Sequence, residues 1–164
     1  MTESPVEVQS ALRTLHGKCC WNVSAGGSAG SSFSLAFGAM VARSRPLSNP
    51  EADEEYRRFE GECTLLVWCS WRLDGVDRSL ASSDQSAATI ATSLRSVLKG
   101  VLVLRAEARG RACDVQLAFE GGLILHIFCD RLPEDSSDAD NWQLETVDHI
   151  LAVGPGFSVN REAR

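Results

Sequence analysis

Two stretches of the chain repeat apolar residues with the period of an α-helix. The first consists of Val8, Leu12 and Leu15, and the second, 82 residues further on, of Ile90, Leu94 and Val97. Gly17 and Gly100 would end the two helices, because glycine readily adopts the left-handed conformation found at helix ends. Ser82 or Ser83 would cap the second one. The spacing predicts two amphipathic helices, each with one face to bury.

Alternating apolar and polar residues predict the strands. Such alternation covers residues 19–25, 33–37, 102–109 and 115–119. Residues 123–129 are apolar on both faces, which is typical of a central strand covered on each side. Each half of the chain then closes with a predicted long strand, at residues 63–73 and 142–153.

Two short identities share the displacement of 82 residues. Leu12-Arg13 recurs as Leu94-Arg95, and Leu35-Ala36-Phe37 recurs as Leu117-Ala118-Phe119. With the matching periodicity they predict a tandem internal duplication. The expected fold class is α+β: a helix followed by three or four antiparallel strands, present twice, with pseudo-twofold symmetry, a shared core and both helices on one sheet face. The αβββ repeats would span residues 1–81 and 82–164 and form one compact domain, since about 80 residues bury too little surface alone.

Composition and charge narrow the classes of function. The 164 residues are 44% hydrophobic, which is enough for a folded domain, and carry a net charge of −6. An acidic balance argues against a nucleic-acid partner, because phosphate-backbone binding needs a concentrated positive surface. The start of the chain lacks the pattern of a secretory signal, and the longest mostly apolar stretch, residues 33–42, is too short to span a membrane. We therefore expect a cytoplasmic protein.

Motifs that resemble catalytic or metal sites each lack a required feature. Residues 26–30 match the G-x-S-x-G pattern, but a strand follows them where a nucleophile elbow needs a helix, so we predict a hairpin loop. The two His-x-x-Cys pairs, at 16–19 and 126–129, do not place four ligands together. The six cysteines are expected to be buried thiols. An enzyme would need His126 or His149 to meet a carboxylate from the other half, so we expect no catalytic residue, metal or cofactor.

Two regions are candidates for binding a partner. If the alternation of residues 63–73 holds, Trp68 and Arg72 share the outer face of a strand, and both residue types are enriched at binding hot spots. The second region is acidic and extends from residue 130 to 148. The predicted contact residues in and beside this acidic region are Glu134, Asp135, Asp138, Asp140 and Trp142. An acidic surface would speed the encounter with a basic partner.

These observations favour a small, acidic, non-catalytic binding protein. The first hypothesis is a protein–protein interaction module, such as a bacterial immunity or inhibitor protein that binds a basic partner. The alternative is a small-ligand-binding domain that uses the cleft between the two repeats, because pockets favour such junctions. A homodimer formed through unpaired edge strands is a further alternative.

Overall fold

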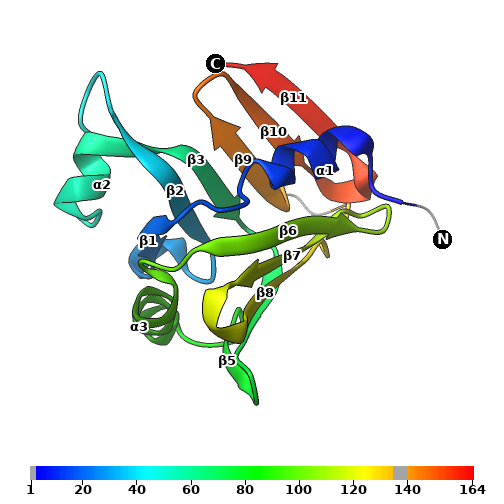
Figure 1. Cartoon of the computed structure of the whole chain (residues 1–164), viewed down its shortest axis with the longest axis horizontal. Helices are drawn as coiled ribbons and strands as arrows, with labels where there is room; N and C mark the ends of the chain where they lie inside the picture. The colour runs from blue at the N-terminus through cyan, green and yellow to red at the C-terminus, as the bar shows by residue number, and fades with distance from the viewer. Residues whose placement is uncertain (1–2, 135–139) are drawn as a thin grey trace.

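The protein is built mainly from β-strands, which form two antiparallel sheets (Figure 1). The computed structural model describes residues 3–134 and 140–164. The first sheet has six strands in the order β1-β2-β3-β9-β10-β11. Their bounds are β1 Cys20–Ala25, β2 Phe33–Ala42, β3 Phe59–Val67, β9 Trp142–Thr146, β10 His149–Val153 and β11 Val159–Ala163.

The second sheet has five strands in the order β5-β4-β8-β7-β6. Their bounds are β4 Ser70–Asp74, β5 Ser79–Ser82, β6 Val103–Arg109, β7 Asp114–Phe119 and β8 Leu123–Phe128. The α-helices are α1 Val6–Arg13, α2 Glu54–Arg58 and α3 Ala87–Leu98, and short 3-10 helices cover Gly27–Ala29, Glu120–Gly122 and Pro155–Phe157. Among the described residues, no helix is long and apolar enough to cross a membrane.

The two predicted helices exist, and their apolar faces are buried. In α1 the buried residues include Val8 and Leu12, and in α3 they include Ile90 and Leu94. The cap of α3 differs from the prediction, because the helix begins after Ser86, whose hydroxyl accepts a hydrogen bond from the backbone N–H of Thr89 at 3.3 Å. The helical period therefore identified the helices, while the cap lies three or four residues beyond the predicted one.

The predicted α+β duplication with both helices on one sheet face is wrong. α1 packs against β6 in the second sheet, whereas α3 packs mainly against β1 in the first. Figure 1 shows the two helices well apart. The halves of the chain also exchange strands, since β4 pairs with β8 and β9 pairs with β3. Each sheet therefore contains strands from both halves, and the repeat boundary at residues 81 and 82 stays a prediction.

The arrangement of the strands differs from the predicted one because two segments predicted as single long strands are each divided between two strands. Residues 63–73 divide between β3, which ends at Val67, and β4, which begins at Ser70. β3 belongs to the first sheet and β4 to the second, so the chain crosses between sheets at Trp68 and Cys69. Residues 142–153 divide into β9 and β10, which pair as a hairpin within the first sheet. In residues 63–73 the alternation of apolar residues continues through the break, and it therefore does not reveal the crossing between the sheets.

One buried cluster joins both sheets and both longer helices. Trp71 and Trp142 are its largest fully buried side chains, and each indole N–H has a partner. The Nε1 of Trp71 donates to the carbonyl of Ser31 at 2.8 Å, and the Nε1 of Trp142 donates to the carbonyl of Cys113 at 3.0 Å. The Trp71 ring also makes an edge-to-face contact with Phe33, with centroids 5.0 Å apart. Both tryptophans thus bury large apolar area without leaving a donor unpaired.

Side chains of α1 and of the turn that follows it cover the outer edge of the second sheet. The Gln9 amide donates to the carbonyl of Ala108 at 2.6 Å and accepts from its N–H at 3.1 Å. Two residues earlier on β6, the N–H of Ala106 donates to Nε2 of His16 at 2.9 Å. β6 is the last strand of this sheet, so these groups would otherwise face solvent. Side chains of the helix and of the turn after it therefore pair with these backbone groups of the edge strand.

Candidate functional site

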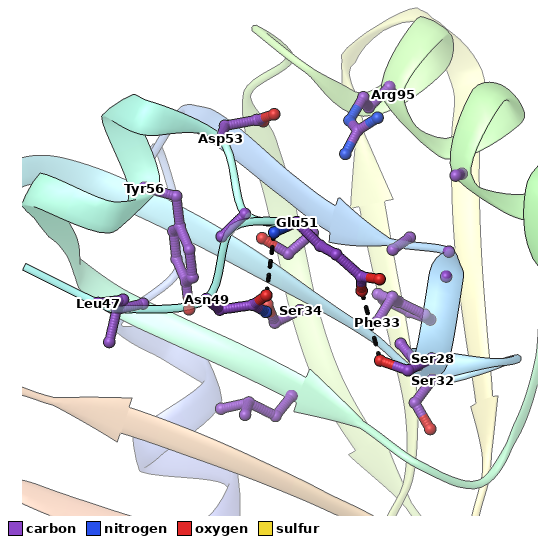
Figure 2. A pocket seen from close by; sticks show the side chains of 18 of the residues that line it. Ser28, Ser32, Phe33, Ser34, Leu47, Asn49, Glu51, Asp53, Tyr56 and Arg95 are labelled. Atoms are coloured by element: carbon purple, nitrogen blue, oxygen red, sulfur yellow. Dashed lines mark hydrogen bonds between the residues drawn. The ribbon is translucent and has the colours of Figure 1, made fainter.

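A pocket of about 530 Å³ opens beside the hairpin of β1 and β2 (Figure 2). Its lining comes from the outward positions of the first sheet, the loop between β1 and β2, the segment that leads into α2, and one face of α3. Both halves of the chain contribute to the lining, because most lining residues fall between residues 24 and 68, and three more belong to α3. The volume lies within the usual range of small-molecule sites.

The loop between β1 and β2 is the glycine-rich segment that matched a nucleophile pattern. Its prediction as a hairpin loop is confirmed, since β1 and β2 pair and a single 3-10 turn joins them. The Ser28 hydroxyl donates to Oε2 of Glu51 at 3.4 Å, so its partner is a carboxylate and not a histidine base (Figure 2). Gly26 has φ +91°, and a Cβ at this position would lie 2.8 Å from the Cβ of Ala91. Glycine therefore lets the loop approach α3 closely.

Three charged side chains line the pocket. Arg95 extends from α3, and its Nε donates to the carbonyl of Val23 on β1 at 3.3 Å. Glu51 and Asp53 belong to the segment before α2. Asp53 accepts a hydrogen bond of 3.3 Å from the amide of Asn22, a residue with only 1% of its surface exposed. A buried amide from β1 thus positions one carboxylate of this segment.

The rest of the lining is uncharged and mixes hydroxyl groups with apolar side chains. The apolar contribution includes Phe33, Leu66 and Trp68, and Tyr56 adds an aromatic ring with a hydroxyl group. The guanidinium of Arg43 lies 4.8 Å from the centroid of the Tyr56 ring, a cation–π contact that holds the ring in place. A ligand could therefore both bury apolar surface and form hydrogen bonds here.

Trp68 and Arg72 do not form one surface. Trp68 is half-buried, lines the pocket and lies in the crossing between the sheets. Arg72 lies on β4 in the second sheet, where its Nε donates to Asp74 at 2.9 Å. Its guanidinium also lies 5.8 Å from the ring centroid of Phe128. The predicted pair is therefore divided between a pocket and an exposed sheet face.

The acidic candidates are also dispersed. Glu134 is exposed in a turn, whereas Asp135 and Asp138 lie outside the described residues. Asp140 is half-buried and accepts a hydrogen bond of 2.6 Å from the amide of Gln143. Trp142 is completely buried in the core, so it belongs to no surface that a partner could contact.

The titratable side chains singled out by the sequence have structural partners. His126 lies 3.0 Å from a carboxylate oxygen of Asp74, on the same sheet face, and His149 contacts the Thr146 hydroxyl at 3.2 Å. All six cysteines are unbridged, and burial raises the pKa of Cys20 to about 12, which disfavours the reactive thiolate. Within the part of the chain that the structure describes, no three metal-binding side chains come together.

Sequence reasoning missed most residues of the pocket, including Glu51, Asp53, Tyr56 and Arg95. The glycine-rich loop was a usable signal, because two adjacent glycines followed by polar residues allow close approach of other groups. The polar segment 44–60 had no pattern that pointed to a site. A comparison with protein-family models, curated proteins and solved structures finds no match to this chain.

Proposed function

We propose that this protein is a non-catalytic binding protein whose pocket takes a small ligand. The pocket lies between three parts of the chain: the β1–β2 hairpin, the segment that leads into α2, and helix α3. The observation that carries the proposal is the mixed lining, which combines hydroxyl, charged and aromatic groups from both halves of the chain in one concave space. Small-molecule sites typically combine apolar walls with a few polar groups that orient the ligand.

The pocket supports binding better than it supports catalysis. Nucleophilic catalysis by a serine needs an adjacent base, and the Ser28 hydroxyl bonds to a carboxylate at a long distance of 3.4 Å. Among the described residues, neither histidine nor cysteine lines the pocket. The proposal therefore assigns orientation and recognition, and no chemical step, to these side chains.

A bulky side chain inside the pocket should abolish ligand binding. Ala88 is exposed on α3 and lines the pocket, so Ala88→Trp would fill it without disturbing the core. In a thermal-shift screen of small metabolites, a ligand at about 100 times its Kd should raise the Tm of the natural protein by about 5–10 °C. The same compound should leave the Tm of Ala88→Trp unchanged.

The matched control is Ser96→Trp, which places the same side chain at an exposed position of α3 outside the pocket. Its ligand response should equal that of the natural protein. A ligand that stabilises Ala88→Trp as strongly as Ser96→Trp would contradict the assignment of this pocket, as would a broad screen in which no compound stabilises the protein.

The hypothesis of a protein partner stays a prediction. The net charge of −6 is consistent with a basic partner. However, the residues predicted for that contact lie in a pocket, on an open sheet face, in the core and outside the described residues. The pocket is a specific feature, whereas this dispersed set defines no single surface, so we favour the small ligand.

A further inference from the structure

We infer that the pocket binds a zwitterionic amine, that is, a small molecule with an ammonium group, a carboxylate and an apolar chain between them. This inference rests on the proposed function and adds the chemistry of the ligand. It follows from three charged side chains, Arg95, Glu51 and Asp53, in a lining that is otherwise uncharged.

Arg95 provides the position for a carboxylate. The hydrogen bond from its Nε to the carbonyl of Val23 holds the base of the guanidinium against β1. The terminal nitrogens extend beyond this bond, and Figure 2 shows the side chain directed from α3 towards the space beside Asp53 and Glu51. A guanidinium held in this way presents a planar pair of N–H donors, which is the geometry that a carboxylate accepts.

Glu51 and Asp53 provide the position for an ammonium group. The backbone N–H of Glu51 donates to the side chain of Asn49 at 3.0 Å, which orders the turn that carries both carboxylates. Asp53 is oriented by the amide of Asn22. These neutral contacts orient the two carboxylates and leave their negative charge uncompensated. An ammonium group, with three donors, can bond to either of them.

Arg95 forms no salt bridge with Glu51 or Asp53 among the described residues. Among the described residues, the salt bridges involve neither Arg95 nor Glu51 nor Asp53. The pocket therefore presents one cation and two carboxylates to whatever occupies it. A ligand with both kinds of charge complements this arrangement, whereas a ligand with one kind leaves the other side of the pocket unmatched.

Apolar side chains provide the position for the middle of the ligand. Phe33, Leu66 and Trp68 line the pocket from β2, β3 and the crossing after β3. Trp68 is half-buried, so part of its ring remains available for contact. A chain of methylene groups would bury apolar surface mainly against Leu66 and Trp68, because Phe33 has only 4% of its surface exposed, while its two ends remain in contact with the charged groups.

The test compares three probes that share a six-carbon chain. 6-Aminohexanoate carries both charges, hexylamine carries only the ammonium group, and hexanoate carries only the carboxylate. By isothermal titration calorimetry, the natural protein should bind 6-aminohexanoate at least tenfold more tightly than either other probe. Arg95→Gln should remove the advantage over hexylamine, and Glu51→Gln should weaken the binding of 6-aminohexanoate at least fivefold.

The matched control is Arg45→Gln, which removes an exposed arginine outside the pocket and should leave all three affinities unchanged. Equal binding of the three probes, or an unchanged preference in Arg95→Gln, would overturn the inference. If 6-aminohexanoate fails to bind while another compound still protects the natural protein and not Ala88→Trp, the zwitterion is wrong and the proposed function stands. If 6-aminohexanoate binds Ala88→Trp normally, both are wrong.

Discussion

Replacing Trp142 with alanine should lower the free energy of unfolding by about 3–5 kcal/mol, the usual cost of deleting a buried aromatic side chain. Trp142 has 0% of its surface exposed, and its indole N–H donates to the carbonyl of Cys113. The substitution therefore creates a cavity and removes one of two donors to the Cys113 carbonyl, which keeps its hydrogen bond of 3.3 Å from the Cys129 thiol. Urea unfolding monitored by circular dichroism measures the change. The slope of the unfolding free energy against urea concentration (the m-value) should stay the same.

Trp68→Ala is the matched comparison, because it deletes the same atoms from a half-buried position. Its cost should be smaller, at most about 2 kcal/mol, since less apolar area returns to water. The sequence alone placed both tryptophans among the contact residues for a partner. A loss below about 1 kcal/mol for Trp142→Ala would mean that this side chain lies at the surface, contrary to the structure.

Gly26→Ala should destabilise the protein by about 2–4 kcal/mol through two effects that add. Gly26 has φ +91° and ψ −172°, a backbone conformation essentially restricted to glycine, with a cost of about 1–3 kcal/mol for other residues. A Cβ here would also lie 2.8 Å from Ala91 and 3.3 Å from the carbonyl of Ala87, which forces α3 away from the hairpin. Chemical denaturation measures the total, and hydrogen exchange of the α3 amides should become faster.

Gly30→Ala separates the two effects. Gly30 lies at the other end of the same turn, with φ +63°, and a Cβ there would have no neighbour within 4 Å. It should therefore cost only the conformational part, and it should leave the exchange of α3 unchanged. Equal losses for the two variants would show that the loop and α3 are not in close contact, and the pocket wall would have to be assigned differently.

The sequence revealed elements better than it revealed their partners. Leu12 and Leu94 are buried on helices, and Leu35 and Leu117 are buried on strands, as their periodicity predicted. Periodicity reports which face of a strand is apolar, and it contains no information about which strand lies beside it. The exchange of β4 and β9 between the sheets is therefore a property of long-range pairing, and the predicted arrangement of two separate αβββ units did not anticipate it.

The candidate site was harder to predict for a related reason. Its charged groups lie in segments far apart in the chain, with Glu51 before α2 and Arg95 in the last turn of α3. In the sequence, Arg95 is one more polar residue on an amphipathic helix. Trp142, in contrast, attracted attention only because it begins a strand beside an acidic region, and its burial depends on packing between the sheets. A large aromatic residue is informative about function only once its exposure is known.

The contacts of Gln9 and His16 with β6 have a consequence for the integrity of the molecule. Because these side chains occupy backbone groups of the strand, a neighbouring polypeptide cannot add a strand there and extend the sheet. The amino-terminal helix and the turn after it thus protect this edge strand from pairing with another chain. We expect that removing or displacing this segment would leave the N–H groups of Ala106 and Ala108 and the carbonyl of Ala108 open to pairing with a strand of another chain.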